Sequence, residues 1–172
     1  MCGILCIVSC SDGRIDCSAV PTRSDEPQCC DDVPGEAPTA AAFQASLLRR
    51  GPDAVDSTTV VCGDVAVELH ASLLQLRGTD TCVALKRLDG CFLCYNGEVF
   101  DGVAVRDEEN DGDALCASLV SSRTLVPGVL SRLRGPWSLV FLDSGNGVLW
   151  FGRDIFGRRR FAHNQPVRFL VF

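Results

Sequence analysis

The sequence predicts an α+β fold in which antiparallel strands pack in layers with a small group of helices. Three hairpin patterns carry this prediction, because each joins two apolar segments through a short glycine-containing turn. The turns are Gly63-Asp64, Asp89-Gly90 and Ser144–Gly147. The expected strand pairs are residues 58–62 with 65–69, 83–87 with 91–95, and 137–143 with 148–154. Antiparallel strands with a few grouped helices between them are typical of a layered α+β protein.

The remaining expected elements are two outer strands and a few helices. Residues 2–8 are apolar and predict a buried strand at the N-terminus, and residues 167–172 predict a last strand. Helices are expected over 40–50, over 112–122 and from Pro127 to near Arg134, with Thr39 and Asp111 as N-caps of the first two. Gly51 is expected in the left-handed C′ conformation that ends the first helix.

Residues 10–38 are polar, rich in Pro, Asp and Ser, and without a hydrophobic period. They are therefore expected to form a mobile insertion. The chain ends at Phe172 within a strand-like segment, which suggests a truncated C-terminal end. Its length otherwise fits one domain over residues 2–172.

Composition excludes several classes of function. A net charge of −6 argues against a nucleic-acid surface. No apolar run is long enough to cross a bilayer, and the first residues lack the basic start of a secretory signal. These features predict a cytoplasmic protein with no nucleic-acid or membrane partner, whose 11 cysteines are mostly reduced thiols. Cys91 and Cys94 have zinc-knuckle spacing without a second Cys or His pair, so no metal site is expected and a metal protein is the weakest alternative.

Cys2 is the first candidate for chemistry. Removal of Met1 would expose its α-amino group, whose unperturbed pKa of about 7.7–8.0 leaves part of it neutral and able to act as a base. Thiol and amine on one residue then form a nucleophile–base pair that needs no histidine. A buried structural cysteine is the alternative, and Cys2 alone does not decide between the two.

Other motifs in the sequence favour the catalytic interpretation of Cys2 over the structural one. Three phrases occur in order: Met1-Cys2-Gly3-Ile4, Arg50-Gly51-Pro52-Asp53 and Tyr95-Asn96-Gly97-Glu98-Val99-Phe100. Together they resemble the class II glutamine amidotransferase domain, an N-terminal nucleophile hydrolase found in glutamine-dependent asparagine synthetases. Further phrases are similar to the asparagine synthetase domain-containing protein branch: Leu76-Arg77-Gly78, Glu109-Asn110-Asp111, Arg134–Ser138 and Leu149–Arg159. The resemblance spans nearly the whole chain except residues 10–38.

The resemblance implies a four-layer αββα sandwich and a glutaminase reaction. In that family the cysteine at Cys2 attacks the side-chain amide carbon of glutamine, releases ammonia and leaves a γ-glutamyl thioester that water hydrolyses. The Asn96 side chain and the Gly97 N–H would then form the oxyanion hole, and Glu98 and Asp111 would bind the ammonium group of glutamine. No cofactor is expected in this domain. ATP and Mg would be needed only by a synthetase domain elsewhere, in this protein or in another subunit, that accepts the ammonia.

One position departs from the family pattern. The carboxylate-binding arginine belongs to a His-x-Arg-Leu phrase, and this chain has His70-Ala71-Ser72-Leu73. Serine cannot supply a bidentate guanidinium, so Arg77 is the tentative substitute. A domain that has lost turnover and serves as a binding or regulatory module is therefore the alternative function.

The candidate residues also have structural alternatives. Asn96-Gly97 could be a type I′ hairpin turn, since apolar residues flank it on both sides. Asp111 could act as a helix cap, Glu98 could be a solvated strand residue, and Arg77 could be an ordinary surface arginine.

Overall fold

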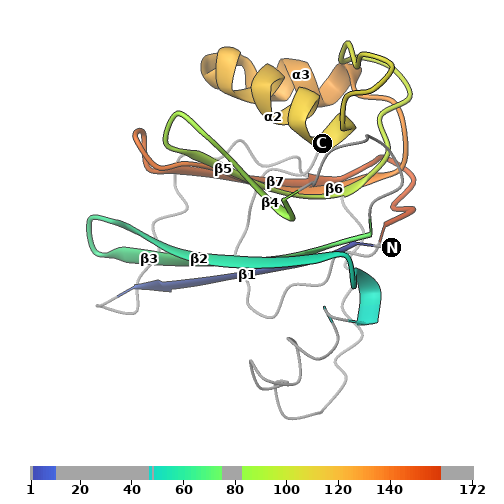
Figure 1. Cartoon of the computed structure of the whole chain (residues 1–172). Coiled ribbons are helices and arrows are strands. Elements are labelled where there is room, and N and C mark those ends of the chain that lie inside the picture. The colour runs from blue at the N-terminus through green and yellow to red at the C-terminus, as the bar shows by residue number, and fades with distance from the viewer. Residues whose placement is uncertain (1, 11–46, 48, 75–82, 160–172) are drawn as a thin grey trace.

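The computed structural model describes residues 2–10, 47, 49–74 and 83–159. Within these residues the strands form two antiparallel sheets, one in the order β1-β3-β2 and the other in the order β4-β5-β6-β7. The first sheet consists of β1 (Gly3–Cys10), β2 (Ala54–Cys62) and β3 (Val65–Leu73). The second consists of β4 (Leu85–Leu88), β5 (Cys91–Gly97), β6 (Trp137–Asp143) and β7 (Val148–Arg153). The two sheets lie face to face, and helices cover the outer face of the second one (Figure 1).

The three predicted hairpins are confirmed. β2 joins β3 through a turn in which Gly63 has a φ of 60°. β4 joins β5 through Asp89 and Gly90, both with positive φ, as a type I′ turn requires. β6 and β7 pair across the third predicted turn, with Asp143 opposite Val148. Local turn chemistry therefore fixes the register within each of these three hairpins.

β1 joins the first sheet by a long-range pairing that no local turn specifies. It runs antiparallel to β3 with Gly3 opposite Ser72 and Cys10 opposite Val65. β3 is therefore the central strand, with β1 on one side and β2 on the other. This pairing brings the N-terminus of the chain to the end of β3, where Leu73 is the last residue of the strand and Leu74 follows it.

Two helices and a 3₁₀ turn follow β5 in the sequence. They are α2 (Asp111–Ser121), the 3₁₀ turn η1 (Arg123–Leu125) and α3 (Val126–Arg132). Pro127 lies in the first turn of α3, as predicted, because its fixed φ suits that position. The N-cap of α2 is Asn110 rather than Asp111, since the Asn110 Oδ1 accepts from the Gly112 N–H at 3.0 Å. The prediction that Asp111 caps this helix was wrong by one residue.

Gly51 has a different role from the one predicted. Its N–H donates to the Leu47 carbonyl at 3.1 Å, and Leu47, Arg49 and Arg50 are helical, so the helix does end here. However, Gly51 does not have a positive φ, so the left-handed C′ prediction was wrong. A Cβ on Gly51 would lie 2.5 Å from the Leu73 backbone nitrogen, and this close approach explains the glycine.

Several sequence predictions fall outside the described residues. They concern nearly all of the insertion at 10–38, the cap Thr39, most of the helix over 40–50, the arginine Arg77 and the last strand over 167–172.

Two hydrophobic clusters hold the layers together. One lies between the sheets and includes Leu69, Leu85 and Leu142. The other lies between the second sheet and the helices and includes Leu115 and Phe141. All seven residues of β6 are buried, because this strand contributes alternate side chains to both clusters. Cys91 and Cys94 likewise belong to different clusters, so their side chains lie on opposite faces of β5.

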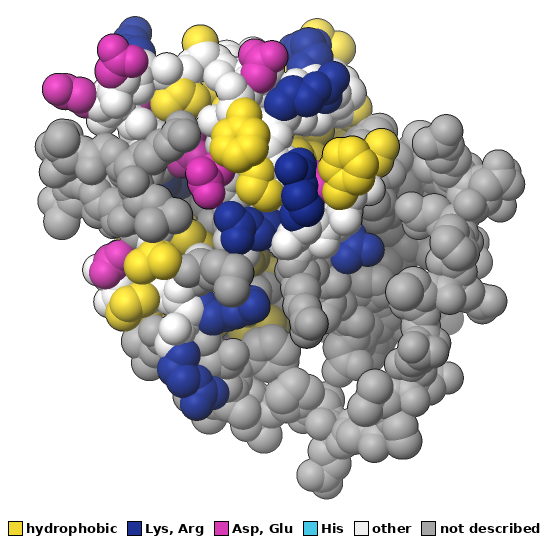
Figure 2. Space-filling model, turned by 90° about the vertical axis from the view of Figure 1, so that its right-hand side faces the viewer, with side chains coloured by type: hydrophobic (Ala, Val, Ile, Leu, Met, Phe, Trp, Pro, Cys, Tyr) yellow, Lys and Arg dark blue, Asp and Glu magenta, His cyan; other side chains and the backbone are white. Residues whose placement is uncertain are grey.

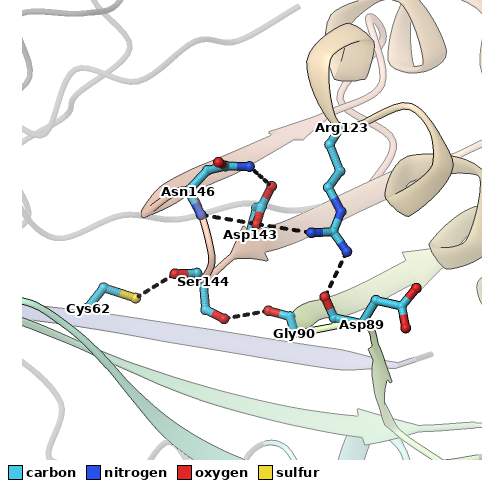
Figure 3. Close-up of polar contacts among 7 residues, drawn as sticks. All are labelled: Cys62, Asp89, Gly90, Arg123, Asp143, Ser144 and Asn146. Carbon is cyan, nitrogen blue, oxygen red and sulfur yellow. Dashed lines mark hydrogen bonds and ion pairs between the residues drawn. The ribbon is translucent and has the colours of Figure 1, made fainter.

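A polar network closes the end of the second sheet where β6 turns into β7 (Figure 3). The Asn146 side chain donates to Asp143 at 2.7 Å, and Arg123 donates to the Asp89 carbonyl at 2.7 Å. Ser144 donates to the Gly90 carbonyl, and so ties the two turns of this end to each other.

Among the described residues, no single helix is long and apolar enough to cross a membrane. Asp111–Ser121 and Arg123–Arg132 together would meet the criteria of length and composition, but the pair is bent by 94°. Their apolar side chains Leu119 and Val126 pack into the core.

Candidate functional site

A small open pocket lies where the N-terminus, the end of β5 and the start of α2 come together. The residues that line it come from five separate parts of the sequence. They are Cys2, Leu73, Leu74, Ala84, Lys86, Tyr95, Gly97, Glu98, Asn110, Asp111 and Gly112. Four of the predicted site residues are therefore brought together: Cys2, Gly97, Glu98 and Asp111.

Cys2 is held in place by the strand that follows it and by the end of β3. The Leu74 N–H donates to the Cys2 Sγ at 3.4 Å, and the thiol lies 3.7 Å from the Leu74 carbonyl oxygen. The next residue is anchored as well, since the Gly3 N–H donates to the Ser72 Oγ at 3.0 Å. Leu74 thus offers both a backbone donor and a backbone acceptor to the Cys2 side chain, and these contacts fix the position of the sulfur. Sequence reasoning missed Leu74, because a backbone N–H leaves no trace in residue type.

Asn96 and Gly97 do not form a hairpin turn. Both lie in β5, opposite Ser138 and Trp137 of β6, and neither has the positive φ that a type I′ turn requires at both positions. The structural alternative for this dipeptide is therefore wrong, and the Asn96 side chain is not used in a turn.

The backbone N–H of Gly97 points away from β6. The neighbouring Glu98 N–H donates to the Pro136 carbonyl at 3.0 Å, and hydrogen-bonded positions alternate along an antiparallel pair. Gly97, opposite Trp137, therefore occupies a position that is not hydrogen-bonded to β6. Consistently, the Trp137 carbonyl accepts from the Asp154 N–H at 2.9 Å, on the β7 side. The Gly97 N–H is thus directed to the side of β5 on which β4 lies, and Gly97 itself lies past the last described β4–β5 pair, Leu85 with Cys94.

Asn96 is adjacent to the pocket but does not line it. Asn96 is buried, with 6% of its surface exposed. On a strand, side chains two residues apart share a face. Cys94 belongs to the cluster between the sheets, so Asn96 faces the sheet whose first strand follows Cys2.

The two predicted ammonium ligands occupy different surroundings. Asp111 is buried, and its carboxylate accepts from the Val99 N–H at 2.9 Å. Glu98 is partly exposed, and Arg159 lies 3.8 Å from its carboxylate. Both carboxylates line the pocket, so this end of the protein presents two acidic groups beside the cysteine.

Lys86 and Tyr95 also line the pocket, and sequence reasoning did not single them out. Lys86 is buried and pairs with Asp113, the two charged groups being 2.9 Å apart. The Tyr95 hydroxyl is buried and has no hydrogen-bond partner among the described residues. Burial raises the pKa of Tyr95 above its usual value, and the negative charges of Asp111 and Glu98 raise it further. Tyr95 is therefore a neutral donor.

A turn after β7 places Arg159 beside Glu98. Asp154 is buried in this turn and accepts from the Trp137 N–H at 3.3 Å and the Arg158 Nε at 3.0 Å. Burial alone would raise the pKa of Asp154, but the hydrogen bonds from Arg158 and from backbone N–H groups lower it overall. Arg158 pairs with Asp154 and Arg159 pairs with Glu98, so ion pairs hold this turn.

The surface near this turn is apolar and basic. Figure 2 views the molecule from the side on which Figure 1 marks the N-terminus. On this face, hydrophobic side chains lie next to Lys or Arg side chains. Ile155 is 87% exposed and Phe156 is 78% exposed, and the Arg158 guanidinium lies 5.3 Å from the centre of the Phe156 ring.

The described residues contain no group of three or more His, Cys, Asp or Glu side chains placed to hold a metal ion. Cys2, Cys6, Cys62, Cys91, Cys94 and Cys116 are free thiols.

Comparison with known proteins shows which proteins the sequence is similar to. No family model matches the chain. It is 34% identical over 163 residues to asparagine synthetase domain-containing protein 1 of Gallus gallus, which covers 92% of the chain and 23% of that protein. It is 36% identical over 118 residues to the protein of the same name from Homo sapiens, which covers 66% of the chain and 18% of that protein. The chain thus spans about a quarter or less of the length of the curated relatives it matches.

These similarities identify an asparagine synthetase-related chain. More narrowly, they place it with the asparagine synthetase domain-containing branch, as the ordered motifs predicted.

Proposed function

We propose that the chain is a glutamine amidotransferase domain that releases ammonia from glutamine through a thioester on Cys2. The observation that carries the proposal is the convergence of Cys2, Gly97, Glu98 and Asp111 on one pocket. Cys2 precedes β1 and Asp111 begins α2, so these residues are widely separated in the sequence. No short sequence pattern would bring them together.

The reaction follows from the chemistry of these groups. After removal of Met1, the α-amino group of Cys2 takes the thiol proton, and the sulfur attacks the side-chain amide carbon of glutamine. The Asn96 amide and the Gly97 N–H stabilise the oxyanion of the tetrahedral intermediate. The protonated amine returns its proton to the departing nitrogen, and ammonia leaves. Water then hydrolyses the γ-glutamyl thioester to glutamate and restores the thiol.

Glutamine is held in this proposal by its charged end. Glu98 and Asp111 bind the ammonium group, and the pocket places the amide end toward Cys2. The Leu74 N–H, 3.4 Å from the sulfur, holds the Cys2 side chain in position before attack. We also propose that the two described sheets and the helices over the second sheet belong to the αββα sandwich of the N-terminal nucleophile hydrolases. The helical residues near Leu47 would be part of the fourth layer. A synthetase domain or subunit that uses ATP and Mg is the proposed acceptor of the ammonia.

A second candidate function rests on Ser72. This serine occupies the position of the family's carboxylate-binding arginine, and its hydroxyl is engaged by the Gly3 N–H. A domain that keeps the fold and binds an amino acid without turnover would fit this substitution, and would serve as a binding or regulatory module.

The experiment is a glutaminase assay on protein whose N-terminus is shown by mass spectrometry to begin at Cys2. The amidotransferase proposal expects ammonia and glutamate in equal amounts, and none from the Cys2→Ala variant. The binding-module alternative expects no ammonia from either protein. A matched control is Cys62→Ala, which removes another free thiol, placed at the far end of β2.

A further inference from the structure

We infer that Lys86 binds the α-carboxylate of the amino acid that occupies this pocket; the inference rests on the function proposed above. Among the described lining residues, Lys86 carries the basic side chain, beside the acidic Glu98 and Asp111. It is also the single lysine of the sequence. A pocket with one cation and two carboxylates matches the charges of a zwitterionic α-amino acid.

The burial of Lys86 requires an anion nearby. The residue is only 5% exposed, and a charged ammonium taken out of water is stabilised only by charged or hydrogen-bonding partners. Asp113 supplies one partner, with both of its carboxylate oxygens 2.9 Å from the Lys86 Nζ. The Asp113 side chain is 52% exposed, so water reaches it from outside. An ammonium group has three N–H donors, and Asp113 alone leaves it with capacity for a second anion.

Lys86 lies beside the first turn of α2. A Cβ added to Gly112 would lie 3.4 Å from the Lys86 Cε and 3.4 Å from the Tyr95 ring, so these two side chains flank the glycine. The Gly112 N–H already donates to the Asn110 Oδ1, but the helix dipole still favours a negative charge beside this first turn. A carboxylate bound by Lys86 would therefore lie next to a second favourable feature of the pocket and near the buried hydroxyl of Tyr95.

The arrangement also accounts for Ser72. This serine is 2% exposed and anchors Gly3, so it cannot reach a substrate carboxylate. The positive charge that the carboxylate needs must come from another segment. Lys86 on β4 supplies it from the side of the pocket where α2 begins.

The test compares two ligands that differ only in the carboxylate. L-Glutamine and 4-aminobutanamide share the amine and the side-chain amide, but 4-aminobutanamide lacks the α-carboxylate. Binding is measured by NMR titration of the full chain carrying Cys2→Ala, so that no turnover occurs. Adding Lys86→Met should weaken glutamine binding by about 10- to 100-fold, the effect of losing a hydrogen bond to a charged group. Binding of 4-aminobutanamide should change by less than about twofold.

Two matched variants separate a ligand contact from a structural role. Asp113→Asn breaks the same ion pair but keeps the Lys86 charge, so it should leave glutamine binding unchanged or tighter. Lys86→Arg keeps the charge and should retain part of the affinity. Equal weakening of both ligands by Lys86→Met, reproduced by Asp113→Asn, would overturn the inference. So would unchanged binding in Lys86→Met together with loss of glutamine binding in Arg77→Met.

The outcome is distinguishable from failure of the proposed function. If the chain with native Cys2 releases no ammonia but glutamine binding depends on Lys86, the glutaminase proposal fails and the carboxylate site stands. If ammonia is released and Lys86→Met leaves the KM for glutamine unchanged, the glutaminase proposal stands and the carboxylate site fails.

Discussion

The backbone N–H of Gly3 donates to the buried Oγ of Ser72 at 3.0 Å. This bond joins the residue after the candidate nucleophile to the central strand of the first sheet. It places the sulfur of Cys2 next to the Leu74 N–H, which follows the same strand. A serine that departs from the family pattern therefore serves to hold the start of the chain.

Ser72→Ala should destabilise the protein and disturb Cys2. The substitution leaves the Gly3 N–H buried without an acceptor, which costs about 1–3 kcal/mol. The free energy of unfolding from urea titration and the glutaminase rate both measure the effect. Ser9→Ala is the matched control on the same strand pair, because its hydroxyl is exposed and bonds the Ala66 carbonyl at 3.4 Å. A loss of stability in Ser9→Ala as large as in Ser72→Ala would contradict the account.

Gly97→Ala should abolish activity and destabilise the second sheet. An added Cβ would collide with the Pro136 carbonyl oxygen and would lie 2.8 Å from the Trp137 Cα, so β5 and β6 must separate there. Overpacking of this kind typically costs about 1–3 kcal/mol. Thermal unfolding and the glutaminase assay would measure both effects.

Gly145→Ala is the control for that variant. Its Cβ would lie 3.5 Å from the Asp143 carboxylate, an ordinary contact, and Gly145 has no positive φ. Its Tm should stay close to that of the parent protein. If Gly97→Ala were fully active and as stable as the parent protein, the close approach of Gly97 to Pro136 would be wrong.

Asp154→Asn should lower stability in a pH-dependent way. Hydrogen bonds from Arg158 and the backbone outweigh burial and hold the pKa of Asp154 below its usual value. The unfolded carboxyl group has a pKa of about 3.9, so the contribution of Asp154 is fully present above that pH and is lost as pH falls through the lower folded pKa.

The measurement is urea unfolding of the parent protein and Asp154→Asn across this range of pH. The difference in unfolding free energy should be about 1–3 kcal/mol near neutral pH and should shrink below about pH 4. Asp64→Asn, in the exposed turn between β2 and β3, serves as the control and should show little difference. If the difference in unfolding free energy between the parent protein and Asp154→Asn grew on acidification, the predicted pH dependence would be contradicted.

Cys94 and Cys116 should resist alkylation in the folded protein. Burial raises the pKa of Cys116 to about 11 and also raises the pKa of Cys94, so few of these thiols are deprotonated. At about pH 8 roughly one Cys116 thiol in 1,000 would be a thiolate. Iodoacetamide labelling followed by peptide mapping would measure this, with the denatured protein as the reference. Rapid labelling of Cys116 in the folded protein would mean that the hydrophobic cluster between the second sheet and the helices is more open to solvent than described.

The sequence anticipated the elements whose causes are local. The hairpins at Gly63 and Asp89-Gly90 were predictable because a positive φ in a tight turn selects those residues. The reason for Gly51 was not predictable, because it lies in an approach to Leu73 from a strand more than 20 residues away. Asn110 and Asp111 are both good caps, so sequence alone did not choose between adjacent positions.

The site was predictable only in part, for a related reason. Cys2, Gly97, Glu98 and Asp111 were found through ordered motifs, and the structure gathers them. Lys86 carried no signal, because its place in the pocket comes from the packing of α2 on β4. A buried lysine becomes noticeable only when its surroundings are known.

The most direct test of the central claim is to trap the acyl-enzyme. Protein that begins at Cys2 is mixed with glutamine, quenched in acid within the first turnovers, digested and analysed by mass spectrometry. The account predicts that the N-terminal peptide gains the mass of one glutamyl residue, that hydroxylamine removes it, and that Cys2→Ala never acquires it. Release of ammonia with the glutamyl adduct on another cysteine, or at the same rate from Cys2→Ala, would contradict the assignment of Cys2 as the nucleophile.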